Sequence, residues 1–326
     1  MKNAIVFFAM LLLTASFSGC IIATEEKTGS DGSGSTSIDN AGGVTIPSEH
    51  GTPIIDESAV STSQDDSGKW HATKTVTITN GFGGADECSL GLDTVNGGIL
   101  VQAWNEGGYK TVANLEGMGD TEQQAKNNLE SLTVTHSDEL SGGRISLKTA
   151  VDVENSLGIL PIDIFGNDWQ NKCATISACV PQSAFYTVDA STTNGDVAAT
   201  TSLRGEKFTA RTTNGAAICS GGFNSLDIST TNGAIEVEIA SAASGAYNLE
   251  TTNGAISMRV KNNGDYGYDV SCKTTNGMLT IYLSNTETIE ESDTSKHVRT
   301  EYYGSREIQI KATLNTTNGA IYVGEW

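Results

Sequence analysis

Histidine and acidic side chains are the groups in this chain best suited to moving protons, so their spacing decides whether catalysis is expected. Polysaccharide-cleaving sites on parallel β-helices need acids and bases clustered on one face. Here the four histidines are scattered, and the outward column of residues just before the repeated motif described below contains no acid cluster. These residues are His50, His71, His136 and His297, and Ser191, Arg211, Ser229, Glu250, Lys273 and Asn315. We therefore expect no catalytic residue, no cofactor and no metal, and a polysaccharide-active enzyme is the weaker alternative.

Cys20 has the clearest covalent chemistry. Lys2 is followed by an apolar run over 4–13 and then by small residues, which is typical of a signal peptide and too short to span a bilayer. The ending Phe17-Ser18-Gly19-Cys20 resembles a lipobox, in which the cysteine sulfur accepts a diacylglycerol, although Phe17 replaces the usual Leu. We expect a signal peptide over 1–19 and lipid attachment at Cys20, with two acyl chains giving firm membrane anchoring. An ordinary secreted protein with an incidental cysteine is the alternative.

Five further cysteines remain, an odd number, so at least one stays free or pairs between molecules. They are Cys88, Cys173, Cys179, Cys219 and Cys272. Cys173 and Cys179 would share one face of a strand about 20 Å apart, so we do not expect them to bridge each other. A bond from one of them to Cys88 stays open, since the compartment is expected to be oxidising. Cys219 and Cys272 fall in apolar columns and are expected to be core thiols.

Residues 20–72 are dominated by Gly, Ser, Thr and acids, a composition that predicts a flexible linker behind the lipidated cysteine. The whole chain has 39 acidic and 19 basic residues, a formal net charge of −20. Such a surface repels nucleic acid, so we expect no nucleic-acid partner.

The tetrapeptide Thr-Thr-Asn-Gly occurs six times and organises the C-terminal half. It starts at residues 192, 212, 230, 251, 274 and 316, and the gaps are 20, 18, 21, 23 and 42 residues. A period near 20 indicates a solenoid or stacked array. Four columns of residues are apolar when positions are counted from the first Thr of each motif. They lie four and two residues before that Thr and five and seven residues after it, and the positions between them are mostly polar. Two half-buried strands therefore flank each motif.

Asn-Gly between alternating strands also fits a β-hairpin, so an antiparallel β meander is the alternative fold. In a solenoid, equivalent residues stack at about 4.8 Å and identical side chains can pair. Six identical corners therefore favour an all-β, single-stranded β-solenoid with rungs of about 20 residues over 191–326. The expected turn and ladder residues, whose glycines take a backbone angle that others resist, are Asn194, Gly195, Asn214, Gly215, Asn232, Gly233, Asn253, Gly254, Asn276, Gly277, Asn318 and Gly319.

The part over 73–190 is less regular and is expected to be a β region continuous with the repeats. Strands are expected at 75–81, 93–104, 132–136 and 144–151, and a short helix within 120–132, capped by Thr121. Residues 284–304 break the repeat. We expect a long excursion from the stack there, with His297, Tyr302 and Tyr303 as a contact surface.

The order of these parts resembles a known family. A strand with Trp104, a short helix with Ala125 and Leu129, "SLTVTH", a strand ending in Val180-Pro181, and repeats ending in "TTNGAIYV" are together similar to the DUF4097 family of candidate adhesins. The likeness covers roughly 73–326. It implies a β-solenoid of the cell envelope and transfers no catalytic residue.

These observations lead us to expect a non-enzymatic, surface-anchored lipoprotein with an adhesin or envelope-contact role. The expected location is the extracytoplasmic cell envelope, with the membrane as one partner and a surface protein or glycan as another. An envelope-stress accessory or sensor protein is the alternative.

Overall fold

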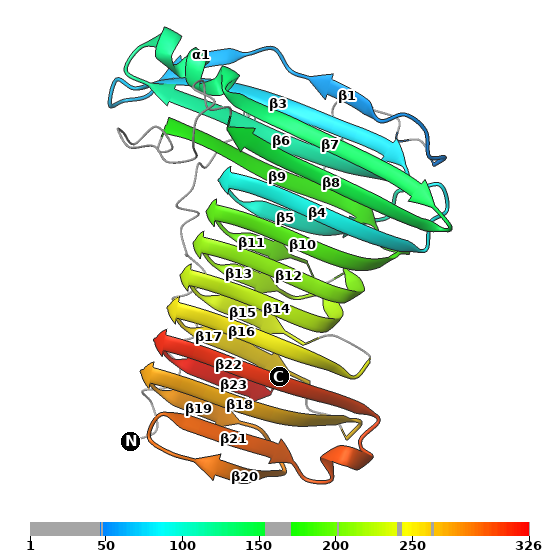
Figure 1. The fold of residues 1–326 in the computed structure, drawn as a ribbon, viewed down its shortest axis with the longest axis vertical. Helices are drawn as coiled ribbons and strands as arrows, with labels where there is room; N and C mark the ends of the chain where they lie inside the picture. Colours follow the sequence, from blue (N-terminus) through cyan, green and yellow to red (C-terminus); the bar gives the residue numbers. More distant parts are fainter. Residues whose placement is uncertain are drawn as a thin grey trace, which may run out of the picture.

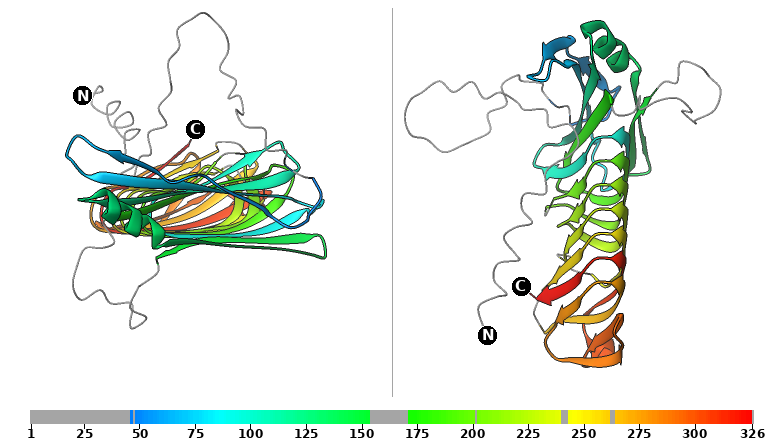
Figure 2. Two further views of the ribbon diagram at one scale, coloured as in Figure 1. Left: turned by 90° about the horizontal axis from the view of Figure 1, so that it is seen from above. Right: turned by 90° about the vertical axis from the view of Figure 1, so that its left-hand side faces the viewer.

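Two long β-sheets face each other and are built mainly from the repeated rungs (Figure 1). This computed structural model describes residues 46, 48–153, 171–200, 202–239, 243–261 and 264–325. The expected signal peptide, Cys20 and the linker as far as residue 45 lie outside the described residues. Seen along the width of the sheets, the rungs form a narrow, elongated stack (Figure 2).

Each rung places one strand in each sheet, joined at an Asn-Gly corner. The strand that enters the corner belongs to sheet B, and the strand that leaves it belongs to sheet A. The seven rungs are β4 (Glu87–Asn96) with β5 (Ile99–Trp104), β10 (Phe185–Asn194) with β11 (Val197–Ala199), β12 (Arg204–Asn214) with β13 (Ala217–Cys219), β14 (Gly222–Asn232) with β15 (Ile235–Glu238), β16 (Gly245–Asn253) with β17 (Ile256–Val260), β18 (Tyr266–Asn276) with β19 (Leu279–Tyr282), and β22 (Ile308–Asn318) with β23 (Ile321–Glu325).

The rungs pair in parallel and in register. Thr212 of β12 lies beside Thr192 on one side and Thr230 on the other, and the corner asparagines pair in the same way. Strands joined through a hairpin would be antiparallel neighbours, so the meander alternative is wrong. The fold is mostly β, with two large and mainly parallel sheets, and is solenoid-like.

The spatial order of the last rungs differs from their order in the chain. Strand β22 lies between β16 and β18, and β23 lies between β17 and β19. The last motif in the sequence, which starts at residue 316, therefore lies in an interior rung. The motif that starts at residue 274 lies in the terminal rung of the stack. Asn318, in the motif nearest the C-terminus, therefore has a neighbouring rung on both sides.

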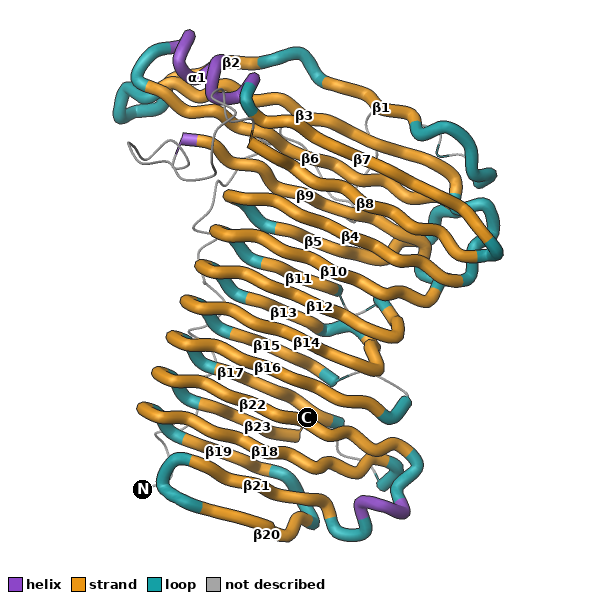
Figure 3. Tube along the Cα trace, in the orientation of Figure 1, coloured by secondary structure: helices purple, strands orange, loops and turns teal. Residues whose placement is uncertain are grey.

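The segment at 284–304 is a cap on sheet B, in contrast to the free excursion we expected. Strands β20 (Thr286–Glu291) and β21 (Ser295–Thr300) form a hairpin, and β21 pairs antiparallel with β18 (Figure 3). Val298 of β21 lies beside Val270 and is 3% exposed, so the hairpin extends the core. A short 3-10 helix, η2 (Tyr303–Ser305), then leads back to β22.

The opposite end of the stack carries antiparallel strands and the helix. Sheet A continues through β9 (Lys172–Pro181), β6 (Gly108–Gly119) and β3 (Trp70–Gly81), and sheet B through β8 (Arg144–Val153) and β7 (Leu132–Ser141). Helix α1 (Glu122–Glu130) packs against β6 and β3 and buries Ala125 and Leu129. As predicted, the Thr121 hydroxyl caps this helix, accepting a hydrogen bond from the Gln124 N–H at 3.2 Å.

The predicted linker over 20–72 ends earlier than its composition indicated. Strands β1 (Ile54–Glu57) and β2 (Ser61–Gln64) both pair antiparallel with β3, which itself begins at Trp70. Their side chains are mostly exposed, including Ile54 and Ile55 of β1, so the two strands bury little apolar surface. Backbone pairing with β3 is what orders them.

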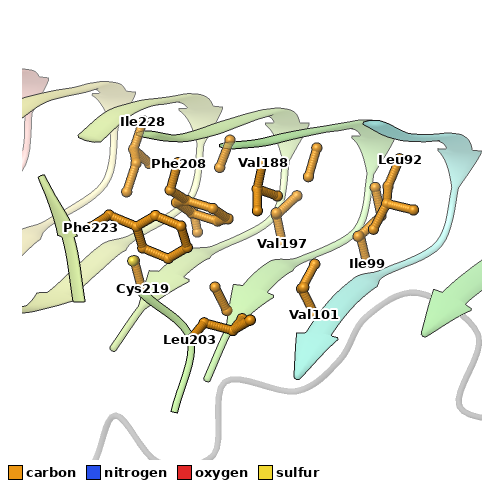
Figure 4. Close-up of a cluster of buried hydrophobic side chains, with 14 of the residues drawn as sticks. Leu92, Ile99, Val101, Val188, Val197, Leu203, Phe208, Cys219, Phe223 and Ile228 are labelled. Atoms are coloured by element: carbon orange, nitrogen blue, oxygen red, sulfur yellow. The ribbon is translucent and has the colours of Figure 1, made fainter. Parts of the chain in front are cut away.

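The core is one continuous layer between the two sheets. The four apolar columns point into it, as the alternation predicted, and Figure 4 shows Val188, Val197 and Phe208 meeting there. Leu279 and Ile281 of the terminal rung are partly buried members of the same columns. Among the described helices, none is long and apolar enough to cross a bilayer.

Candidate functional site

The corner asparagines form a one-directional ladder of side-chain hydrogen bonds. Each Nδ2 group donates to the Oδ1 atom of the asparagine on the neighbouring rung. The bonds run from Asn276 to Asn318 (2.8 Å), Asn318 to Asn253 (2.7 Å), Asn253 to Asn232 (2.8 Å), Asn232 to Asn214 (2.8 Å), Asn214 to Asn194 (2.6 Å) and Asn194 to Asn96 (2.5 Å). Asn96 was not among the predicted ladder residues, because its motif reads Thr-Val-Asn-Gly.

The first threonine of each motif is buried and bonds to the neighbouring corner. The Thr251 hydroxyl donates to the Gly233 carbonyl oxygen at 3.0 Å, and Thr274 donates to Gly319 in the same way. The second threonine of each motif is exposed. Because amide and hydroxyl groups at the corners bond to one another, this face stabilises the stack and offers few unpaired groups to a ligand.

The corner glycines are required mainly by close backbone approach. A Cβ atom on Gly254 would overlap the carbonyl oxygen of Gly233, and the other corner glycines are placed in the same way. We expected every corner glycine to have a φ angle that other residues rarely adopt, and this prediction is wrong for most corners. Only Gly97 and Gly195 have φ in the positive region, at 147° and 154°.

The distal end of sheet A leaves a backbone donor open. Along sheet A, the N–H of the first residue of each strand donates across to the next rung, as Ile256 does to Ala320 and Ile321 to Met278, both at 2.9 Å. Leu279 holds the next place in this series, and within the described part of the chain its N–H has no acceptor. Strand β19 is therefore an unpaired edge, the kind of backbone row that accepts an added strand.

The two sheets end at different levels here, which leaves a step beside β19. Sheet B continues past β18 through β21 and β20, whereas sheet A stops at β19. Exposed apolar side chains lie at this edge: Met278 is 68% exposed, and Tyr282 (57%) and Tyr322 (41%) lie on the outward face of sheet A with their rings 6.1 Å apart. We call this region, β19 with Met278, Tyr282 and Tyr322, the distal edge.

The three residues expected as a contact surface separate into different roles. His297 Nε2 lies 2.5 Å from Asp269 Oδ1, and Arg299 donates to the other carboxylate oxygen at 2.9 Å. The Arg299 guanidinium stacks over the Tyr303 ring at 5.8 Å. Burial alone raises the pKa of Asp269, but the hydrogen bonds from His297 and Arg299 outweigh it and lower the pKa. His297 and Tyr303 thus fix the hairpin, while Tyr302 is 79% exposed with a left-handed φ of 57°.

The described chain enters the fold at the end opposite the distal edge. The Gly83 N–H donates to the Ser48 carbonyl at 3.2 Å, and Gly51 exchanges hydrogen bonds with the Asn80 side chain. His50 Nε2 lies 3.5 Å from the buried Asp138 carboxylate. These contacts fasten the entering segment to β3 and β7.

Asp138 is the centre of a buried polar cluster at that end. It accepts hydrogen bonds from Tyr109 and Asn80, both at 2.6 Å, and Tyr109 also contacts His136 Nε2 at 2.9 Å. Burial raises the pKa of Tyr109 and lowers that of His136. The cluster is closed by its own hydrogen bonds and joins β6 of sheet A to β7 of sheet B.

His71 lies between two carboxylates on the outer side of β3. Its Nδ1 atom is 2.6 Å from Glu116 Oε1, and its Nε2 atom is 3.2 Å from Asp65 Oδ2. Burial alone lowers the pKa of His71, but the bonds to Glu116 and Asp65 outweigh it and raise the pKa above 6.5. Across the described ranges, no three His, Cys, Asp or Glu side chains are grouped to hold a metal ion.

All five cysteines of the folded part are free thiols. Cys88, Cys173, Cys219 and Cys272 are buried, and Cys179 is partly buried and accepts a hydrogen bond from Gln102. The structure therefore has no bond between Cys88 and either Cys173 or Cys179. Burial raises the pKa of Cys219 and of Cys272 to about 12, so both are inert core thiols, as their columns indicated.

The residues of the distal edge were missed by sequence reasoning. A signal was present, because Tyr282 and Tyr322 are large aromatic residues at outward positions that are mostly polar in the other rungs. The pattern could not show that β19 is the terminal strand, since that depends on where β23 inserts.

Comparison with known proteins finds similar solved structures but no matching family. No family model matches the chain, and no curated protein matches it. Among solved structures, the chain is similar to a candidate cell adhesion protein from Clostridium sporogenes, with 12% identity and a TM-score of 0.45 over 84% of this chain and 100% of that one. It is also similar to a candidate adhesin from Bacteroides fragilis, with 11% identity and a TM-score of 0.26 over 83% of this chain and 97% of that one.

Proposed function

We propose that this chain is a non-enzymatic adhesion module of the cell surface, anchored through a lipid on Cys20 and related to the DUF4097 adhesins. The observation that carries the proposal is the position of the distal edge. It lies at one end of sheet A, and the described chain enters at the other end, beside β3. Nine strand-to-strand steps of about 4.8 Å lead from β3 to β19, a separation of roughly 43 Å.

Anchoring at Cys20 would place the distal edge on the side of the body away from the membrane. The ladder, the threonine bonds and the continuous core support a body that holds this edge at a fixed distance. Such an arrangement suits contact with a partner outside the cell, and it gives the stacked rungs a mechanical role as a spacer.

The partner best suited to the distal edge is an extended protein segment that adds as a strand to β19. The open N–H of Leu279 offers a backbone bond, and the added strand would lie over the inner face of β21 on the projecting part of sheet B. Met278 and the outward ring of Tyr282, which itself contacts Tyr322, would lie beside the outward apolar side chains of the added strand. The net charge of −20 favours a segment that also carries Lys or Arg.

The test is binding of the full chain to intact cells, in a Cys20→Ser background so that a lipid does not contribute. The double variant Met278→Lys with Tyr282→Lys places charges on the distal edge while leaving the core unchanged, and we expect at least a tenfold loss of retention. The matched control is Ile55→Lys with Val60→Lys, two apolar residues similarly exposed on the opposite end of the stack. Equal retention of both double variants would refute the distal edge as the contact surface.

A further inference from the structure

A separate hollow lies on the margin of the stack opposite the Asn-Gly corners. It is formed where three neighbouring strands of sheet A end. The turn after β5 leads to β6 of the same sheet, and the turns after β9 and β11 lead to sheet B. Trp104, Asn105 and Glu106 come from the first turn, Gln182 from the second, and Arg204 from the start of β12. The hollow has a volume of about 450 Å³ and is open to solvent.

The tryptophan in this hollow is held in place by backbone contacts. Its indole Nε1–H donates to the Gly108 carbonyl at 2.8 Å, and its own carbonyl accepts the Gln182 N–H at 2.9 Å. The indole N–H is therefore already used, and what the partly exposed ring offers a ligand is its apolar surface. Aromatic faces carry negative charge density and attract polarised C–H groups.

The remaining lining is polar and has little net charge. Glu106 contributes one negative charge and Arg204 one positive charge, and an Arg204 Nη2 bond to the Ser183 carbonyl at 3.3 Å holds the guanidinium at the rim. Within the described residues, the side chains of Asn105, Glu106 and Gln182 make no hydrogen bond. Each amide provides both a donor and an acceptor, and the carboxylate provides acceptors.

We propose that this hollow binds a short stretch of a neutral oligosaccharide. Sugars present C–H faces that pack on an indole ring and adjacent hydroxyl groups that both donate and accept. Those two features match Trp104 on one side and Asn105, Gln182, Glu106 and Arg204 on the other. An apolar ligand would leave these polar groups unpaired, which costs free energy. A polyanion would meet Glu106 and a chain of net charge −20.

The site is independent of the distal edge. Strand β5 is six strands away from β19 along sheet A, or roughly 30 Å. A charged substitution at Met278 or Tyr282 therefore leaves the hollow unchanged. Failure of the adhesion proposal and failure of the saccharide proposal would be seen in different variants.

The experiment uses the full chain with Cys20→Ser, first on a printed array of neutral and acidic oligosaccharides. The strongest neutral hit is then titrated by calorimetry. We expect Trp104→Ala and Arg204→Ala each to weaken binding at least tenfold, Trp104→Phe to retain part of it, and Met278→Lys with Tyr282→Lys to bind like the parent.

A thermal melt of every variant shows whether it is folded. Arg204→Ala and Glu106→Gln change only exposed side chains, so they test the site even if Trp104→Ala fails to fold. The proposal is overturned if no neutral oligosaccharide binds, if only acidic glycans bind, or if the Arg204 and Glu106 variants both bind with the parent affinity.

Discussion

The side chain of Asn318 donates to Asn253 at 2.7 Å, although 65 residues separate the two in the chain. Asn318 also accepts a hydrogen bond from Asn276 at 2.8 Å, so it has a ladder partner on both sides. Asn276 has a ladder partner on one side only among the described residues. The relationship reverses what the chain order predicts, because the motif nearest the C-terminus is inside the row.

The ladder therefore predicts an order of stabilities. Asn318→Ala and Asn253→Ala each remove two side-chain hydrogen bonds, and Asn276→Ala removes one. At about 1 kcal/mol for each bond, we expect Asn318→Ala and Asn253→Ala to lower the free energy of unfolding by similar amounts, and Asn276→Ala by about half as much. Urea unfolding of the three variants measures this, and an equal loss in all three would contradict the ladder.

Gly254→Ala tests the close approach of the corners. The added Cβ would overlap the Gly233 carbonyl oxygen, and backbone on both sides must shift to relieve the overlap. We expect a loss of about 1–3 kcal/mol in the free energy of unfolding, the usual cost of overpacking. Gly264→Ala is the matched control, because nothing lies within 4 Å of its Cβ position. If both variants unfold at the same urea concentration, the corner does not need glycine.

Val298 tests whether the β20–β21 hairpin is part of the core. Val298→Ala removes two buried methyl groups. At about 0.8 kcal/mol for each, we expect the free energy of unfolding to fall by about 1.5 kcal/mol. The control is Ile289→Ala on the same hairpin, where the side chain is 46% exposed. Similar melting temperatures for Val298→Ala and the parent would show that the hairpin packs loosely on β18.

His71 makes part of the stability depend on pH. Its folded-state pKa is raised above the unfolded value of 6.5 by Glu116 and Asp65, despite burial. The contribution of these ion pairs is therefore complete below pH 6.5 and is lost as the pH rises through the folded-state pKa. We expect the difference in unfolding free energy between the parent and His71→Gln to be larger at pH 5.5 than at pH 9. A difference that grows with pH would have the wrong sign.

Cys20→Ser tests the address that the N-terminal sequence indicates. If the cysteine carries a lipid, the variant should move from the membrane fraction to the medium, while a Cys179→Ser control stays with the membrane. Phase separation in Triton X-114 gives a second measurement. Unchanged partitioning of Cys20→Ser would exclude lipid attachment there.

Much of the rung could be predicted because each position repeats. Val188, Phe208 and Leu226 occupy one column in the sequence and one column in the core, since alternation has the same meaning in every strand. Identical corners also indicated which residues face each other across rungs. They could not indicate which rungs are neighbours, because a Thr-Thr-Asn-Gly corner fits equally well beside any other.

The strands missed by the prediction share a physical cause. β1 and β2 are ordered by backbone pairing along β3 and bury few side chains, so their composition still resembles a linker. The hollow at Trp104 joins turns from three strands whose residues are up to 100 positions apart, and no local pattern records that meeting.

The insertion of β22 and β23 between older rungs has a consequence for synthesis. While the chain emerges from the ribosome, β18 and β19 have no finished surface to join, because the rung that separates them from β16 and β17 is made last. Strands β18 and β19 therefore cannot take their final positions until the last twenty or so residues, which form β22 and β23, have been synthesised. A chain truncated before β22 would lack an interior rung. Strands β18 and β19 and the β20–β21 hairpin would then have no neighbouring strand to pair with on that side.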